Sequence, residues 1–237
     1  MFNIRHILLV TFVYCLSMTS AYSLDFNDVK KSLKNIKGTA VLPGTDMMVI
    51  TLKTGETLMM SKNGHYLVRN GEILDMWNKM VIKSFADVDK STLIDLKKLR
   101  INIKELSTYT MGKGKSEVTI FVDPVDCRYG TKLLSQIPIN KIKVNLVLLP
   151  IINKKSSMIS RAIVCAKYTP AEVFSIIREC KWKSIPEKTD CSSLPLQKAL
   201  VTAKIIGVKS VPNTLFSDGR LLKGSGKNVM QKIRSFY

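Results

Sequence analysis

The stretch FVDPVDCRYGTKLL, Phe121 to Leu134, decides the fold of this 237-residue chain. An apolar run breaks into a short turn carrying Cys127, and a helical pattern of apolar residues follows. The start of a helix presents unpaired backbone N–H groups with a partial positive charge, and Arg128 adds a full charge. Both favour the reactive thiolate at Cys127, although Asp126 partly opposes it by like charge. A dithiol redox site would have its second cysteine at position 130, which is Gly130, so the pattern predicts chemistry at a lone thiol.

Composition predicts a folded chain with two modest domains, because 46% of its residues are hydrophobic. The formal net charge is +19, but Lys and Arg are spread along the whole length without a dense basic tract. No nucleic-acid reader motif accompanies the charge, so we expect a solvated basic surface and no nucleic-acid partner.

The first 23 residues are typical of a cleavable export signal. Arg5 is followed by an apolar run over residues 7–16, and Ala21 and Ser23 occupy the positions that an A-x-A-like cleavage site requires. We expect cleavage after Ala21 or Ser23, with a retained membrane anchor as the alternative. Cleavage would also remove Cys15.

Four cysteines would remain after cleavage: Cys127, Cys165, Cys180 and Cys191. Four cysteines allow three fully paired connectivities, and in an oxidising compartment at least one disulfide is expected. The chain has no CxxC pair, and its one mature histidine, His65, lies far from the cysteines in sequence. We therefore expect no metal site and no cofactor, and we interpret His65 as a half-exposed strand residue.

The N-terminal third predicts a short helix followed by an antiparallel meander. Apolar residues recur at helical spacing over 24–37, and alternating segments over 47–53, 56–60 and 65–69 are separated by Gly-containing turns. Several methionines and Trp77 accompany this small sheet. They either fill its own core or form a surface that a second copy of the chain would cover, and the sequence favours neither.

The rest of the chain predicts a connecting helix and an α/β domain. Apolar residues at helical spacing over 87–106 predict the helix, and the small, basic segment 111–116 marks a domain boundary. The expected order is then a strand over 118–122, the Cys127 helix, a strand over 142–149, helices over 156–167, 170–180 and 195–206, strands over 213–216 and 220–223, and a helix from 227. Such a sheet, flanked by helices, would hold Cys127 at the carboxyl end of its strand.

Four segments in this order resemble the DsbC and DsbG family of periplasmic disulfide isomerases. They are TIFVDPVDCRYGTKL, KVNLVLLP, AIVCAK followed by TDCSS, and GVKSVPNTLFSDGRLLKG. The resemblance implies an α+β chain with a signal peptide (1–23), a small antiparallel-sheet dimerisation domain (24–84), a linker helix and hinge (85–114) and a thioredoxin-like domain (115–237). It also implies a V-shaped periplasmic homodimer whose apolar cleft holds exported proteins that are unfolded or misoxidised.

The resemblance assigns roles to individual residues. Cys127 looks like the attacking cysteine, and Cys165 with Cys191 looks like the family's structural disulfide. Pro212 looks like the cis-proline of the family, and Val211 like the residue that touches the substrate backbone. The expected substrate-binding residues are therefore Arg128, Tyr129, Val211 and Pro212.

Gly130 departs from the family because it stands where the resolving cysteine belongs, and Cys180 has no counterpart there. We expect Cys180 to be a free or buried thiol rather than a remote resolving cysteine. A single thiol can still isomerise disulfides, whereas net oxidation or reduction needs a second thiol. The prediction is a protein disulfide isomerase or thiol-disulfide oxidoreductase of monothiol type, with chaperone-like substrate binding and a membrane thiol reductase as a recycling partner.

Two other functions remain open. One is a redox-inactive thioredoxin-like chaperone or a component of envelope or secretion-system assembly, in which Cys127 is a relic. The other is the reduction of sulfenic acids on exported proteins, which suits one accessible thiol.

Overall fold

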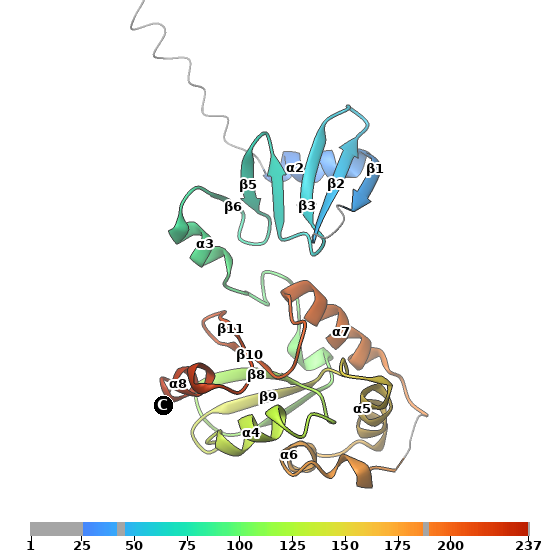
Figure 1. The fold of residues 1–237 in the computed structure, drawn as a ribbon, viewed down its shortest axis with the longest axis vertical. Helices are drawn as coiled ribbons and strands as arrows, with labels where there is room; N and C mark the ends of the chain where they lie inside the picture. The colour runs from blue at the N-terminus through green and yellow to red at the C-terminus, as the bar shows by residue number, and fades with distance from the viewer. Residues whose placement is uncertain (1–25, 42–45, 187–189, 237) are drawn as a thin grey trace, which may run out of the picture. The chain divides into compact units, whose positions relative to one another are not determined.

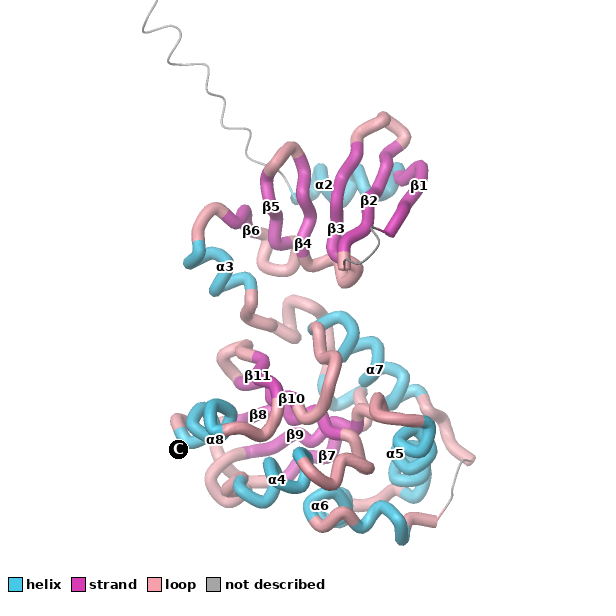
Figure 2. Tube along the Cα trace, viewed as in Figure 1, coloured by secondary structure: helices cyan, strands magenta, loops and turns pink. Residues whose placement is uncertain are grey.

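The computed structural model describes residues 26–41, 46–186 and 190–236, and the predicted export signal lies outside these ranges. The chain divides into two compact units, Met1–Met59 and Met60–Tyr237. Each contains helices and strands, so the predicted α+β class is confirmed (Figures 1 and 2). The described residues form two sheets, one of six strands in the order β1 to β6 and one of five strands.

The first unit has a shorter helix and one more strand than the sequence predicts. The helix expected over 24–37 ends early because Ile36 begins a strand. The elements are α2 (Phe26–Ser32), η1 (Leu33–Asn35), β1 (Ile36–Val41), β2 (Met47–Leu52) and β3 (Thr57–Ser61). Strand β1 pairs antiparallel with β2, and every residue of β1 is exposed. It is therefore an edge strand whose side chains all face solvent.

The second unit starts at Met60, within β3, and continues with β4 (Tyr66–Arg69), β5 (Glu72–Asp75) and β6 (Met80–Ile82). His65 was expected to be half exposed, but it is 7% exposed. Its ring stacks between those of Tyr66 and Trp77, with centroids 3.9 and 3.8 Å away, and its Nε2 lies 3.2 Å from the buried carboxylate of Asp75. Burial lowers the pKa of His65, although the charge of Asp75 opposes the shift.

The long connecting helix predicted over 87–106 is wrong. Helix α3 covers only Phe85–Ser91, and the chain then forms turns. The N–H of Ile94 donates to the carbonyl oxygen of Gly219 at 2.8 Å, so this segment hydrogen-bonds to a distant turn. Arg100 adopts a left-handed backbone conformation, which no continuous helix permits. Tertiary hydrogen bonding thus overrides the apolar periodicity.

The remaining elements form a five-stranded sheet with helices. They are η2 (Ile103–Glu105), β7 (Thr108–Met111), β8 (Glu117–Val122), α4 (Tyr129–Gln136), β9 (Lys143–Leu148), α5 (Lys154–Ala166), α6 (Pro170–Arg178), η3 (Lys181–Ser184), α7 (Leu194–Ile206), β10 (Asn213–Phe216), β11 (Leu221–Lys223) and α8 (Lys227–Arg234). The order is β11-β10-β8-β9-β7, with β8 and β9 parallel and the other pairs antiparallel. This is a thioredoxin-like arrangement, in which a helical crossover joins the parallel central strands and a hairpin follows an X-Pro bond. Strand β7 was not predicted, and it lies in the segment interpreted as linker.

The central strands β8 and β9 are buried on both faces. Val118, Ile120 and Val122 belong to the larger core cluster, together with residues of α4, α5, α6 and α8. Phe121 points to the other face, where it packs in a second cluster with residues of α7 such as Ala203. The alternation of side chains along β8 therefore holds the sheet between two helical layers, and the carboxyl end of β8 opens into the Cys127 turn.

Within the described ranges, no helix is long and apolar enough to cross a membrane. The same residues contain no group of three or more His, Cys, Asp and Glu side chains that could hold a metal ion.

Candidate functional site

A buried carboxylate anchors the turn that leaves β8. Asp123 is fully buried, and its Oδ1 accepts a hydrogen bond from the N–H of Val125 at 3.1 Å. Its Oδ2 accepts from the N–H groups of Ile151 and Ile152, which follow β9, both at 3.0 Å. One side chain therefore fixes the carboxyl ends of both central strands, and it holds the turn before Cys127 in place.

Asp126 caps helix α4. Its carboxylate accepts hydrogen bonds from the N–H groups of Arg128 (3.2 Å), Tyr129 (2.9 Å) and Gly130 (3.0 Å). The sequence predicted that the unpaired N–H groups of this helix start would favour a thiolate at Cys127. Instead, the buried carboxylate of Asp126 accepts hydrogen bonds from these N–H groups. Its negative charge largely cancels the partial positive charge of the helix start, so this charge does little to stabilise a thiolate at Cys127.

Cys127 is not a lone thiol, because it forms a disulfide with Cys180, with the Cα atoms 5.2 Å apart. Cys180 was expected to be free or buried, and this expectation is wrong. The two residues are 53 positions apart and lie on different elements, Cys127 before α4 and Cys180 just after α6. The hydroxyl of Thr131 also donates to the carbonyl of Ile177 at 3.0 Å, so the start of α4 and the end of α6 lie together. The site thus contains a pair of cysteines joined by a disulfide, although the sequence has no CxxC motif.

The backbone at Cys180 is unusual for a cysteine. Its φ of 55° and ψ of 36° are left-handed, and it directly follows the last turn of α6. Helices commonly place glycine at such a position, because any side chain there costs about 1–2 kcal/mol. The residue here is a cysteine, and its sulfur is bonded to Cys127.

Trp182 was not recognised from the sequence, yet its side chain contacts the disulfide. Its indole Nε1–H donates to the Sγ of Cys127 at 3.1 Å. The ammonium of Lys155 lies 4.4 Å from the centre of the indole ring, and that of Lys183 lies 5.7 Å from it. The sulfur of Cys127 therefore faces an N–H donor supported by two cations, which favours negative charge on it once the disulfide opens.

The Val211–Pro212 peptide is cis. It lies at the end of the sheet where β8 leads into the turn that carries Cys127. Asn213 pairs with Phe121 in the antiparallel register of β10 and β8, so Pro212 lies beside the carboxyl end of β8. The carbonyl of Pro212 accepts from the N–H of Gly224 at 2.8 Å. Among the described residues, no hydrogen bond engages the main-chain N–H or carbonyl of Val211. The N–H and the carbonyl of Val211 can therefore form hydrogen bonds with another chain, and they lie near the end of β8 that precedes Cys127.

The other predicted site residues surround Cys127 in different ways. Cys127, Arg128 and Tyr129 are all exposed, and the guanidinium of Arg128 lies 5.2 Å from the Tyr129 ring centre. Gly130 is buried on the α6 side of α4. A Cβ at Gly130 would lie 3.6 Å from Oδ2 of Asp126 and 3.8 Å from Cγ2 of Ile177, which are ordinary contacts. Neither space nor backbone therefore requires glycine there.

The second disulfide joins Cys165 and Cys191, with the Cα atoms 5.4 Å apart. Cys165 is 4% exposed on α5, and Cys191 lies in the segment that leads into α7. This bond is buried at one end within the helical layer, whereas the Cys127 end of the other bond is exposed.

No protein-family model and no curated protein matches the chain. Solved structures do. A disulfide interchange protein from Neisseria gonorrhoeae aligns at 18% identity over 57% of this chain and 98% of that chain, with a TM-score of 0.49. The thiol-disulfide exchange protein alpha-DsbA2 from Wolbachia pipientis aligns at 16% identity over 65% and 100%, with a TM-score of 0.49. The catalytic domain of Proteus mirabilis ScsC aligns at 18% identity over 54% and 88%, with a TM-score of 0.42. At these values the function rests on the site alone.

Proposed function

We propose that this protein is an exported thiol-disulfide exchange protein that works through the Cys127–Cys180 pair. The single observation that carries the proposal is an exposed disulfide at the carboxyl end of β8, beside a cis-proline. The carboxyl ends of the strands are where α/β sheets place their sites. The pair replaces the monothiol mechanism that the sequence suggested.

The proposed exchange is balanced in two steps. A substrate thiolate attacks Sγ of Cys127, forms a mixed disulfide and expels Cys180 as a thiolate that then takes up a proton. A second substrate thiolate attacks the substrate sulfur of the mixed disulfide and expels Cys127. The substrate loses two electrons to form its disulfide, and the protein gains them as two thiols. In the reverse direction, reduced Cys127 opens a substrate disulfide and Cys180 releases the product.

Exposure decides which sulfur is attacked. Cys127 is exposed, whereas Cys180 is only partly exposed at the end of α6. The indole N–H of Trp182 points to Cys127, and it stabilises that sulfur when it leaves as a thiolate. Cys127 is therefore the attacking residue of the reduced protein, and Cys180 is the resolving one.

Substrate binding uses the main-chain groups of Val211. An extended substrate segment next to Val211 would exchange backbone hydrogen bonds with it, in the manner of an added strand. Arg128 and Tyr129 flank Cys127 and are exposed, so they contact the residues next to the substrate cysteine. No further cofactor is needed for the exchange.

The test is to trap the mixed disulfide. Reduced Cys180→Ser protein is mixed with a secreted protein whose disulfides have been scrambled, and the products are separated without reductant. We expect a covalent complex through Cys127 to accumulate, because the resolving thiol is missing. Cys127→Ser should form none. Trapping through Cys180 in Cys127→Ser, or none in Cys180→Ser, would contradict these roles.

The finer assignment, a DsbC/DsbG-like isomerase that also binds unfolded exported proteins as a chaperone, is part of the proposal. It requires a homodimer. Strand β1 supports pairing between copies, because it is an edge strand with every residue exposed, including Ile36 at 39% and Val41 at 55%. Val41→Lys should give a monomer in light scattering, while Lys204→Gln, at an exposed position on α7 outside this strand, leaves the association unchanged. A membrane thiol reductase would return the pair to its reduced state.

A second candidate is a redox-inactive chaperone or envelope assembly component. The observation in its favour is that Cys127–Cys180 ties the start of α4 to the end of α6, as a structural clamp would. This candidate predicts that refolding of scrambled substrate is the same with Cys127→Ser as with the unmodified protein.

A further inference from the structure

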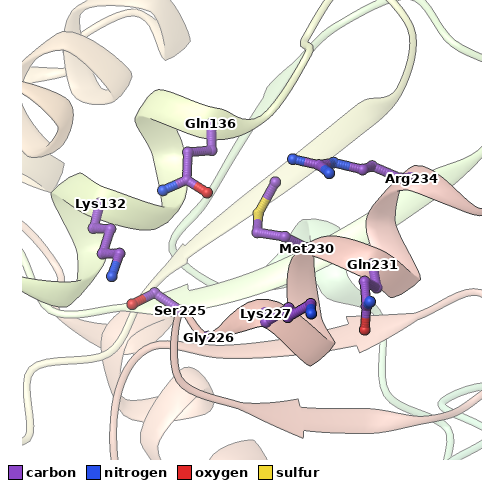
Figure 3. A pocket seen from close by; sticks show the side chains of 8 residues that line it. All are labelled: Lys132, Gln136, Ser225, Gly226, Lys227, Met230, Gln231 and Arg234. Carbon is purple, nitrogen blue, oxygen red and sulfur yellow. The ribbon is translucent and has the colours of Figure 1, made fainter.

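A pocket of about 300 Å³ lies between helices α4 and α8, on the helical face that carries the larger core cluster. Figure 3 shows Lys132 and Gln136 reaching into it from α4, with Met230 and Arg234 opposite them on α8. Ser225 closes one side from the turn before α8. The proposed exchange reaction uses none of these side chains.

All the charged side chains that line this pocket are positive. Its lining contains three cations, Lys132, Lys227 and Arg234, and no Asp or Glu. None of the three forms an ion pair in the described part of the chain. By contrast, Lys232 on the same helix lies outside the lining and pairs with Asp218 at 2.6 Å. The pocket therefore holds cations that lack a counter-ion, which favours an anion between them.

The start of α8 adds backbone donors. Gly226 is the N-cap and provides no side-chain cap, and the first turn contains no acidic residue. Lys227 is the first helical residue, where a positive charge is unfavourable because the helix N-terminus is itself positive. The first-turn N–H groups of this eight-residue helix are thus uncapped, and they border the cationic pocket.

A serine that is more than nine-tenths buried points independently to a ligand. Ser225 is 7% exposed, and its Oγ has no hydrogen-bond partner among the described residues. In Figure 3 its oxygen is directed into the pocket, on the side of the Lys132 ammonium. A hydroxyl, an ammonium and uncapped N–H groups therefore converge on one space.

We infer that this pocket binds the phosphate group of a small ligand or a lipid headgroup. Phosphate carries the negative charge and the several acceptor oxygens that Lys132, Ser225 and the α8 N-terminus can share. Gln136 and Arg234 supply further donors at the rim, and Met230 provides an apolar wall for the group that bears the phosphate. The site is separate from the disulfide chemistry and does not rest on it.

To test this inference, the full chain is titrated with inorganic phosphate in about 0.15 M salt, which screens long-range electrostatic attraction between phosphate and the basic protein. The backbone amides of residues 227–229 are followed by NMR. We expect saturable shifts of these amides. Lys132→Gln should weaken binding about tenfold, and Ser225→Ala by a similar factor, because each removes a hydrogen bond to a charged group. Lys204→Gln, on α7, removes the same charge from an exposed site outside the pocket and should leave binding unchanged.

Shifts that do not saturate would overturn the inference, as would equal weakening by Lys204→Gln and Lys132→Gln, because either shows general attraction to a basic protein. Urea unfolding of each variant confirms that it is folded. Glycerol phosphate and phosphatidylglycerol vesicles then separate the two sources. Lys132-dependent binding of the ester alone supports a soluble ligand, and Lys132-dependent binding of vesicles supports a headgroup.

Discussion

The two disulfides should contribute differently to stability, although their loop lengths predict nearly equal effects. Sequence separations of 26 and 53 residues correspond to about 3.5 kcal/mol for Cys165–Cys191 and about 4 kcal/mol for Cys127–Cys180 by loop-closure entropy. By loop length alone, the Cys127–Cys180 bond would contribute more to stability than Cys165–Cys191.

The site reverses this order. When the Cys127–Cys180 bond opens, the indole N–H of Trp182 remains as a donor to the Cys127 thiolate, and a hydrogen bond to a charged group is worth about 1.5–3 kcal/mol. The folded reduced state recovers this amount, so the net contribution of the bond falls to about 1–2.5 kcal/mol. Cys165 is buried on α5 among apolar residues, and no such recovery is expected for its bond.

The measurement uses two paired variants. Cys165→Ser with Cys191→Ser retains only the Cys127–Cys180 bond, and Cys127→Ser with Cys180→Ser retains only the other. Each is unfolded in urea with and without reductant, and the difference in free energy of unfolding is the contribution of its bond. A difference of about 2 kcal/mol between the two bonds corresponds to a reduction potential about 40 mV less negative for Cys127–Cys180.

If reduction of Cys127–Cys180 costs the full loop-closure value, Trp182 does not stabilise the reduced state as proposed. A bond that the fold stabilises by about 4 kcal/mol resists reduction and acts as a clamp, which would favour the redox-inactive candidate. Trp182→Phe provides the internal control. It removes the N–H donor while keeping an aromatic ring, and it should make the contribution of the bond larger.

Three further perturbations test the site and its support. Gly130→Cys restores the CxxC spacing in a position that accepts a Cβ, so we expect the new thiol to pair with Cys127 and leave Cys180 open to alkylation, as mass mapping would show; Gly130→Ala should leave the Cys127–Cys180 pair intact. Asp123→Asn replaces an acceptor of three N–H groups and should lower the free energy of unfolding by about 2 kcal/mol, and an unchanged urea midpoint would contradict its anchoring role. His65 is the only histidine after residue 6, and its pKa is lowered by burial. The unfolded chain therefore binds more protons below its ordinary pKa of about 6.5, so stability should fall as the pH drops through that value, and His65→Gln should remove this dependence.

Much of the thioredoxin-like domain could be predicted because its signals are local. The buried strands read as apolar runs, and Pro170 and Gly207 mark a helix start and a helix end. The connecting helix could not be excluded from the sequence, because its apolar residues have helical spacing. Its fate depends on a hydrogen bond from Ile94 to the distant Gly219, and the sequence carries no sign of that contact.

The partner of Cys127 could not be predicted for a related reason. A CxxC motif places both sulfurs on one helix turn, so spacing alone reveals it. Cys180 reaches Cys127 only because α6 packs against α4, and it carries no spacing signal. A cysteine just after α6, where helices favour glycine, was the available hint, but reading it requires knowing where α6 ends.

Moving the second sulfur from position 130 to Cys180 changes what an exchange cycle does to the protein. In a CxxC site both sulfurs lie on one rigid helix turn, so opening the bond leaves the rest of the fold attached as before. Here the bond is a covalent link between the turn before α4 and the start of η3, and Trp182 on η3 donates a hydrogen bond to the sulfur of Cys127. A mixed disulfide at Cys127 therefore releases the Cys180 end of η3, while the Thr131–Ile177 hydrogen bond still holds α6. The trapped Cys180→Ser complex should accordingly show faster amide exchange over residues 180–185 and unchanged exchange over α6. Equal protection of both segments would mean that the disulfide opens without loosening η3.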